Sequence, residues 1–261
     1  MLSSLDRWLA PAPDAARVGW LTRGAYAHRG LHGPGAVENS PTAFERALAA
    51  GLGIECDVQL TADGRAVVFH DFELDRLTGE RGPVARRTAA ELGQIGLTGS
   101  SDRIPALRQL LEQIGGRVPL LIEVKTGRGM PVDGLCRAIV RDLQEYAGPH
   151  AVMSFDPRVG HWFARHAPAT VQGLVISESD SGAAARRLSL WRGKPEFLAY
   201  DVRNLPSCFA ERQQRRGLPL LTWTVRSAAL AERAAASAAT AIAEGEGCAG
   251  VLRQAQDERS E

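Results

Sequence analysis

Short apolar runs alternate with helical patterns along almost the whole chain, and this alternation limits the possible folds more than any other feature. The runs are Ala25–His28, Ile54–Gln59, Ala66–His70, Pro119–Val124, Ala151–Phe155, Val171–Ile176, Phe197–Asp201 and Leu218–Val225. Most are apolar nearly throughout, as are the strands of a parallel sheet that is covered on both faces. Eight strands with intervening helices in a chain of 261 residues predict a (β/α)8 TIM barrel rather than an open doubly wound sheet.

The segments between the runs carry helix signals. Ser40-Pro41 is typical of an N-cap followed by the first helical residue. Apolar positions 107, 110, 111 and 114 share one helical face, and Gly115-Gly116 closes that helix. Another helix is expected behind Pro131, and the alanine-rich stretch Ser227–Ala243 is expected to be helical throughout.

One connection is too long for an ordinary βα loop. Residues 72–105 contain several glycines and prolines and little periodicity, so we expect an insertion after the third strand, on the active face. The predicted organisation is an N-terminal extension over residues 1–24 and a barrel domain over residues 25–253, with the insertion at about 72–105. A polar, disordered tail is expected over residues 254–261.

Composition excludes several classes of function. The 31 basic residues nearly cancel the 30 acidic ones, so the chain lacks the basic surplus of a non-specific nucleic-acid binder. No run approaches a membrane span, and the first 21 residues lack the apolar block of a secretory signal. The four cysteines form no zinc-binding pattern. A reduced, cytoplasmic protein is predicted, although a mature chain without its leader would look the same.

Three carboxylates lie at the ends of the predicted strands. Glu55 and Asp57 are two residues apart and therefore share one face of their strand, while Cys56 points the other way. Glu123 adds a third carboxylate from another strand, and the carboxyl ends of barrel strands meet at one mouth. Three hard oxygen donors favour Ca²⁺ or Mg²⁺ over zinc. The alternative is a set of salt bridges to Arg29 and Lys125.

Two histidines and two cations lie at the same strand ends. His28 and His70 each close an apolar run, and an imidazole can accept or donate a proton near neutral pH. The alternative is that each histidine is only a structural hydrogen-bonding group. Lys125 and Arg29 are candidate phosphate ligands, and the alternative for Lys125 is a simple partner for Glu123.

Taken together, these motifs resemble those of the glycerophosphodiester phosphodiesterase family. The resemblance spans roughly residues 25–226. It is carried, in order, by His28-Arg29, Glu38-Asn39, Glu55-x-Asp57, His70-Asp71, the IEVK sequence at 122–125 and the LTWTV sequence at 221–225. Each motif is weak by itself, but their order along the chain is specific.

The resemblance implies a (β/α)8 barrel with a segment inserted after the third strand. It implies that Glu55, Asp57 and Glu123 hold a divalent metal, Ca²⁺ or Mg²⁺, and that His28 and His70 act as general acid and base. Arg29 and Lys125 would then lie close to the phosphate. Phe155 and Trp223 would line the substrate cleft, or else belong to the barrel core.

The activity that the resemblance implies is hydrolysis of a glycerophosphodiester to sn-glycerol 3-phosphate and an alcohol, through a cyclic phosphate. The alternatives are a lysophospholipid or other lipid phosphodiesterase, for which Trp8 and Trp20 are candidate interface residues, and a non-catalytic phosphate-ligand binder. The chain departs from the family pattern at Arg226, where asparagine is usual. It also lacks a Thr-Asp-x-Pro phrase near Gly250–Arg253. We expect these departures to affect substrate preference and the closing of the barrel's edge.

Overall fold

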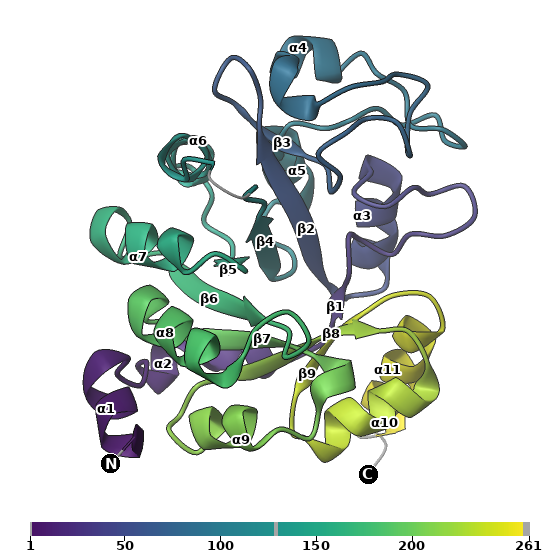
Figure 1. Cartoon of the computed structure of the whole chain (residues 1–261). Coiled ribbons are helices and arrows are strands. Elements are labelled where there is room, and N and C mark those ends of the chain that lie inside the picture. Colours follow the sequence, from purple (N-terminus) through teal and green to yellow (C-terminus); the bar gives the residue numbers. More distant parts are fainter. Residues whose placement is uncertain (1, 128–129, 258–261) are drawn as a thin grey trace. The chain divides into compact units, whose positions relative to one another are not determined.

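In the computed structural model of the chain, apolar runs form strands and amphipathic segments form helices (Figure 1). The structure describes residues 2–127 and 130–257. The strands are β1 (Tyr26–Ala27), β2 (Gly53–Leu60), β3 (Ala66–Val68), β4 (Leu120–Val124), β5 (His150–Ser154), β6 (Val171–Ile176), β7 (Phe197–Asp201), β8 (Leu220–Val225) and β9 (Thr240–Ala243). The helices are α1 (Leu2–Leu9), α2 (Ala15–Val18), α3 (Pro41–Ala49), α4 (Ala89–Leu92), α5 (Leu107–Ile114), α6 (Asp133–Leu143), α7 (Pro157–His166), α8 (Ala183–Gly193), α9 (Cys208–Gln214), α10 (Ala228–Ala236) and α11 (Glu246–Asp257). Three short 3-10 helices are η1 (Gly19–Thr22), η2 (Val84–Arg86) and η3 (Val202–Asn204).

The chain divides into two units. The first takes in Met1–His28 and Ala151–Glu261, and the second is Arg29–His150. In the first unit, β1, β9, β8, β7, β6 and β5 lie side by side in that order, each parallel to the next. In the second unit, β4 pairs with β2 in parallel and β3 pairs with β2 antiparallel. All six residues of β6 are buried, as expected for a parallel strand covered on both faces.

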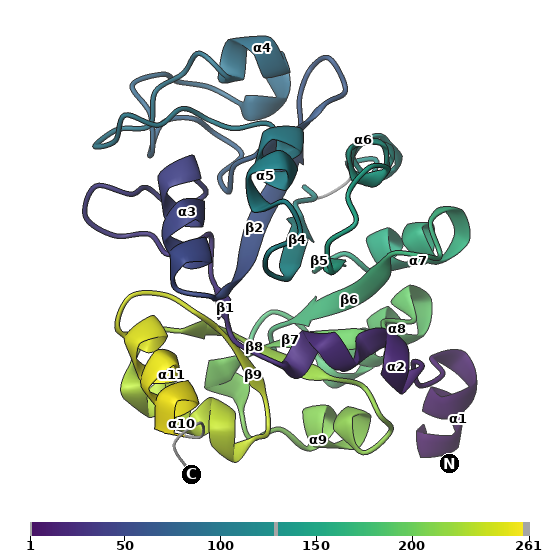
Figure 2. The same ribbon diagram turned by 180° about the vertical axis from the view of Figure 1, so that it is seen from behind.

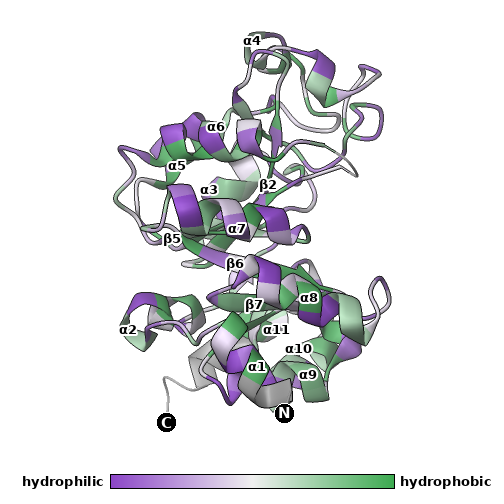
Figure 3. Ribbon diagram, turned by 60° about the vertical axis from the view of Figure 1, so that its left-hand side comes forward, coloured by the Kyte–Doolittle hydropathy of each residue, from purple (hydrophilic) through white to green (hydrophobic). Residues whose placement is uncertain are grey.

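The helix signals at Ser40-Pro41, at positions 107–114 and behind Pro131 are confirmed by α3, α5 and α6. The Ser40 hydroxyl accepts a hydrogen bond from the backbone N–H of Ala43 and so caps α3, whose first residue is Pro41. Helix α5 buries its four predicted apolar side chains and ends at Gly115, whose φ of 56° is left-handed. In the first unit, α7 carries both hydrophilic and hydrophobic residues along its ribbon (Figure 3), and its buried residues include Trp162 and Phe163.

The sequence predicts a parallel strand over Ala66–His70, and this prediction is wrong. Strand β3 is antiparallel to β2, with Val58 opposite Val68 and Leu60 opposite Ala66. Only residues 61–65 separate the two strands, whereas a parallel crossover needs about a dozen or more residues. The connection contains Asp63-Gly64, with Gly64 at φ 70°, which is typical of a hairpin.

The eighth parallel strand lies instead in the stretch predicted to be one alanine-rich helix. Helix α10 ends at Ala236, and β9 follows at Thr240–Ala243. The helix prediction rested on the intrinsic preference of alanine for helices. It was wrong because three of the four β9 residues are buried in the sheet, and this packing outweighs that preference. Gly250–Arg253 therefore lies inside α11, and the residue that follows the closing strand is Glu244. Helix α11 continues through residues 254–257 of the predicted tail, and residues 258–261 lie outside the described residues.

The predicted insertion connects β3 to α5 and is drawn in blue in Figure 1. It holds η2, α4 and isolated β-bridges such as the one between Thr78 and Leu97. It has its own small core, formed by Val67, Phe69, Leu74, Val84, Leu92, Leu97 and Ile104. This core packs the insertion against Phe69, the residue that precedes His70.

The N-terminal residues pack onto the first unit, where Figure 2 shows α1 and α2 in purple. Asp6 on α1 is 2% exposed. Its carboxylate accepts a hydrogen bond from the Trp191 indole at 2.9 Å and lies 3.3 Å from the Arg187 guanidinium, both on α8. Among the residues that the structure describes, no helix combines the length and the apolar character needed to cross a membrane.

Replacing Asp6 by alanine should lower the free energy of unfolding by about 1 to 3 kcal/mol, because it removes the buried acceptor of Trp191 and Arg187. Urea denaturation followed by circular dichroism should show a lower midpoint with an unchanged slope. As a control, Glu112→Ala breaks an exposed pair with Arg108 and should change stability by about 0.5 kcal/mol or less. An unchanged midpoint in Asp6→Ala would show that this contact contributes nothing.

Candidate active site

Glu55, Asp57 and Glu123 form one cluster because of the register between β2 and β4. Asp57 lies opposite Glu123 on the neighbouring parallel strand, and Glu55 is two residues before Asp57. Glu55 and Asp57 are each 1% exposed. Each of the three residues offers an oxygen, and these oxygens lie within 4.8 Å of one another. The structure thus brings together the three carboxylates that the sequence analysis selected.

Two cations border this cluster. The Lys125 ammonium lies 3.0 Å from Glu123 Oε1 and 3.5 Å from Asp57 Oδ1. The backbone N–H of Arg29 donates to Glu55 Oε2 at 2.9 Å, and its guanidinium Nε lies 3.1 Å from Asp57 Oδ2. The salt bridges that were the alternative to a metal site are therefore present, and they share the cluster's oxygens with any cation that binds there.

The charges in the cluster shift one another's pKa values. Burial, followed by the Asp57 and Glu123 carboxylates, raises the pKa of Glu55 well above its usual range. Burial acts to lower the pKa of Lys125, but Glu123 and Asp57 outweigh it and the net pKa is raised. Lys125 therefore keeps its positive charge beside carboxylates that repel each other.

Glu38 and Asn39 belong to the site, although the sequence analysis gave them no role. The Asn39 side chain donates to Asp57 Oδ2 at 2.9 Å and accepts from the Asp57 backbone N–H at 3.2 Å. Asn39 adopts a φ of 59°, a left-handed conformation that asparagine tolerates better than most residues. Glu38 accepts from both Arg29 and Arg76, each at 2.7 Å. The Glu-Asn motif was the available signal for both residues.

His70 follows β3 and faces a carboxylate. Its Nδ1 lies 2.7 Å from Asp71 Oδ1, and Arg76 donates to the same oxygen at 3.1 Å. Burial acts to raise the pKa of Asp71, but the bonds from Arg76 and His70 prevail and lower it to about 2. An ionised Asp71 favours the tautomer with the proton on Nδ1, which leaves Nε2 as the nitrogen that can accept a proton.

A cavity of about 350 Å³ lies beside His70 and Lys125. It is lined by His70, Asp71, Phe72, Glu73, Asp75, Arg76 and Lys125. Lys125 also contacts Glu123 and Asp57, so one cation borders both the cavity and the cluster. Gln59 fixes the segment in between, because its side-chain amide donates to the backbone oxygens of Phe69 and Asp71.

His28 ends β1 in the first unit and also faces a carboxylate. Its Nδ1 lies 2.6 Å from Glu244 Oε2. Phe155 and Trp223, in the same unit, contact each other edge to face with ring centroids 5.4 Å apart. Phe155 is 45% exposed, so its ring is not part of a barrel core.

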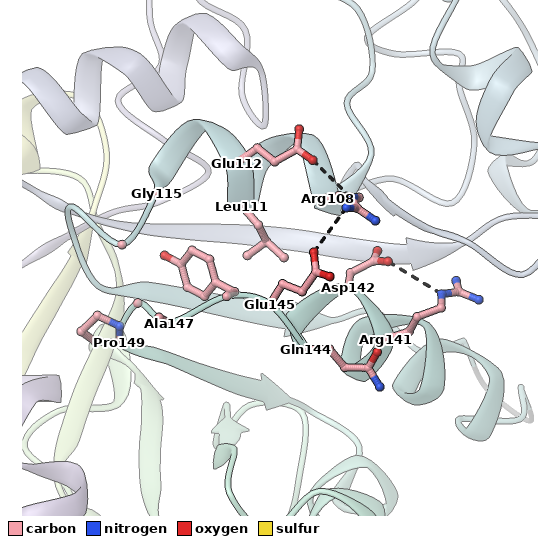
Figure 4. Close-up of a pocket in the computed structure, with 13 residues that line it drawn as sticks. Arg108, Leu111, Glu112, Gly115, Arg141, Asp142, Gln144, Glu145, Ala147 and Pro149 are labelled. Carbon is pink, nitrogen blue, oxygen red and sulfur yellow. Dashed lines mark hydrogen bonds and ion pairs between the residues drawn. The ribbon is translucent and has the colours of Figure 1, made fainter.

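A larger cavity in the second unit contains none of the predicted site residues. Its volume is about 650 Å³, and it lies between α5 and α6 with the connection to β5 (Figure 4). Its charged side chains pair with one another, as Arg108 does with Glu112 and Glu145. The smaller cavity, which His70 and Lys125 line, is therefore the better candidate for a phosphodiester site.

The carboxylate cluster fits a divalent cation. Its donors are carboxylate oxygens, which Ca²⁺ and Mg²⁺ prefer, and they already lie within one coordination sphere of each other. A bound cation would also relieve the repulsion that raises the pKa of Glu55.

Comparison with known proteins identifies the family of the chain. The model of the glycerophosphoryl diester phosphodiesterase family matches residues 28–251. A glycerophosphodiester phosphodiesterase from Caldanaerobacter subterraneus is 38% identical over 213 residues, which cover 76% of this chain and 84% of that protein.

Solved structures share the fold. A phosphodiesterase from Oleispira antarctica, solved with its product sn-glycerol-3-phosphate, has a TM-score of 0.79 at 23% identity and covers 91% of this chain and 98% of its own. A glycerophosphodiester phosphodiesterase from Thermotoga maritima has a TM-score of 0.70 at 22% identity, covering 90% and 98% of the two chains. The predicted (β/α)8 TIM barrel is thereby confirmed. With the match of the family model over residues 28–251, the chain belongs to the glycerophosphoryl diester phosphodiesterase family.

Proposed function

We propose that this enzyme hydrolyses glycerophosphodiesters to sn-glycerol 3-phosphate and an alcohol. The observation that carries the proposal is the cluster of Glu55, Asp57 and Glu123, bordered by Lys125 and by the cavity that contains His70. A phosphodiester carries one negative charge, and Lys125 and Arg29 are the cations at the cluster that can bind its non-bridging oxygens. The solved relative that contains sn-glycerol-3-phosphate supports this class of substrate.

Glu55, Asp57 and Glu123 would hold Ca²⁺ or Mg²⁺, and the cation when bound supplies positive charge for the phosphate oxygens. Arg29 holds two of these ligands in place, Glu55 through its backbone N–H and Asp57 through its guanidinium. Asn39 fixes Asp57 from the other side. These contacts orient the carboxylates before any ligand arrives, which lowers the cost of ordering them on binding.

His28 and His70 are proposed to take part in general acid–base catalysis, one as the acid and the other as the base. Each faces a carboxylate through Nδ1, which directs proton exchange to Nε2. Cys56 is not a candidate nucleophile, because it is fully buried and burial, followed by the nearby carboxylates, raises the pKa of its thiol well above its usual range. The nucleophile is therefore proposed to be the neighbouring hydroxyl of the substrate's own glycerol.

In this route one histidine removes the proton of the glycerol hydroxyl as its oxygen attacks phosphorus, and the other protonates the departing alcohol oxygen. The product of this step is a cyclic glycerol phosphate. Water then opens the ring with the two histidines in exchanged roles, giving sn-glycerol 3-phosphate. Arg29 and Lys125 stabilise the negative charge that develops on the non-bridging oxygens. Phe155 and Trp223 are proposed to line the substrate cleft.

Chelation should abolish release of glycerol 3-phosphate, and added Ca²⁺ or Mg²⁺ should restore it. The assay should compare several glycerophosphodiesters with a lysophospholipid, because faster turnover of the lysophospholipid would favour the lipid phosphodiesterase alternative.

Added cation should also raise the melting temperature of the metal-free protein, and Glu55→Gln should reduce that rise. Glu112→Gln, an exposed site, is the control. Full activity in protein shown by elemental analysis to be metal-free would contradict the metal proposal.

His28→Ala and His70→Ala should each lower kcat by a factor on the order of 10² to 10⁴, the usual range for a positioned acid or base. The double variant should lose less than the product of the two factors if the histidines act as a pair. His161→Ala, an exposed position on α7, is the matched control and should keep wild-type kcat. Near wild-type turnover by His70→Ala would remove His70 from the mechanism.

A substrate analogue whose glycerol 2-hydroxyl is replaced by hydrogen should bind with similar affinity but turn over more slowly by a factor on the order of 10³ or more. The reason is that an intramolecular nucleophile has a large effective concentration, which the analogue loses. Binding is measured by competition and turnover by alcohol release. Comparable turnover of the two compounds would favour direct attack by water and rule out the cyclic intermediate.

A further inference from the structure

Three neighbouring strands of the first unit end side by side and bring three residues together. The sheet order is β1, β9, β8. The His28 backbone N–H donates to the Ala243 oxygen at 2.8 Å, and the Glu244 backbone N–H donates to the Val225 oxygen at 3.0 Å. The residue that follows each strand therefore lies next to the residue that follows its neighbour. These residues are His28, Glu244 and Arg226.

The Glu244 carboxylate connects the other two side chains. One of its oxygens, Oε2, lies 2.6 Å from His28 Nδ1, and the other, Oε1, accepts from Arg226 Nε at 2.5 Å. The His28 and Glu244 side chains are 10% and 18% exposed, while Arg226 is 60% exposed. The arrangement thus runs from a nearly buried imidazole, through a carboxylate, to an arginine at the surface.

The backbone around Glu244 is closely packed against β8. Gly247, in the first turn of α11, approaches so closely that a Cβ there would lie 1.9 Å from the Val225 oxygen. Gly245 has a φ of 56°, which a glycine adopts without strain. These two glycines let the chain turn directly from β9 into α11, and this turn fixes the place from which Glu244 reaches His28.

We propose that Arg226 and Glu244 are positioning residues for His28. Glu244 accepts a hydrogen bond from Nδ1–H and so fixes the ring and its tautomer, and Arg226 orients the Glu244 carboxylate. The inference rests on the proposed function, in which His28 exchanges a proton with the substrate. It adds a role for Arg226, the residue at which the chain departs from the family pattern.

The arrangement has the same composition as the one around His70. There, Asp71 faces Nδ1 and Arg76 bonds to that carboxylate. In both places a carboxylate that bonds to an imidazole N–H selects one of two tautomers, and loss of that carboxylate leaves a wrong tautomer or a misdirected ring. A merely structural ion pair between Arg226 and Glu244 would affect stability but would not change the position of the His28 proton.

The kinetic test compares Glu244→Gln, Glu244→Asp and Arg226→Ala in the metal-loaded full-length enzyme. Glu244→Gln keeps the side-chain size and should lower kcat at least about tenfold with little change in KM. Glu244→Asp keeps the carboxylate and should recover part of that loss. Arg226→Ala should cause a smaller loss than Glu244→Gln. Arg215→Ala is the matched control, because Arg215 is an exposed arginine paired with a glutamate on α9, and it should keep wild-type kcat.

The second measurement is the ¹⁵N NMR spectrum of histidine-labelled protein at about pH 8, where an ordinary imidazole is neutral. The His28 signals are assigned by their loss in His28→Ala. Wild-type protein should show the Nδ1–H tautomer at His28, and Glu244→Gln should shift the tautomer population while circular dichroism stays unchanged.

Wild-type kcat in Glu244→Gln, or an unchanged His28 tautomer, would overturn the proposal. If instead His28→Ala keeps full activity, the role of His28 fails and the positioning role fails with it. If the wild-type protein releases no glycerol 3-phosphate, that result contradicts the proposed function but does not test the hydrogen bond between Glu244 and His28. The NMR comparison would still decide whether Glu244 fixes the His28 proton.

Discussion

Three carboxylates that share one buried place repel one another, and burial removes the water that would screen them. Glu55, Asp57 and Glu123 form such a cluster. Several neighbouring groups of the second unit reduce the repulsion between them. Arg29 and Lys125 supply positive charge from two sides, and Asn39 donates a neutral hydrogen bond to Asp57. These partners do not offset burial and repulsion in full, since burial, followed by the Asp57 and Glu123 carboxylates, still raises the pKa of Glu55. The remaining imbalance is what a divalent cation would correct.

Each of the two histidines also has a carboxylate beside it that is paired with an arginine. His70 is bordered by Asp71 and Arg76, and His28 by Glu244 and Arg226. In each case the carboxylate lies between an imidazole and a guanidinium, and the positive charge of the guanidinium balances the charge of the carboxylate. Arg76 is also shared with Glu38, which in turn bonds to Arg29. A continuous set of ion pairs therefore connects the histidine in the second unit to the carboxylate cluster.

Sequence reasoning identified most of the strands and the members of the cluster because the apolar pattern of a strand and the spacing of its side chains are local properties. Glu55 and Asp57 share a face by spacing alone, whereas Glu123 joins them through the observed register, in which it lies opposite Asp57. It failed for Ala66–His70, where the short Asp-Gly connection was a hairpin signal, and for Thr240–Ala243, where burial overrides the helix preference of alanine. Glu244 could not be selected, because its place beside His28 depends on β9, which the helix prediction had removed.

The antiparallel pairing of β3 with β2 has a consequence for how the protein folds. Glu55, Asp57 and His70 lie on or next to one hairpin, in which the Phe69 backbone N–H donates to the Asp57 oxygen at 3.0 Å. By contrast, the pairing of β1 with β9 joins Tyr26 to Ile242 and needs nearly the whole chain to be in place. Contacts between residues close in sequence cost less loop-closure entropy and form earlier. During synthesis the hairpin therefore leaves the ribosome, carrying Glu55, Asp57 and His70, long before the partner strand of β1 has been made.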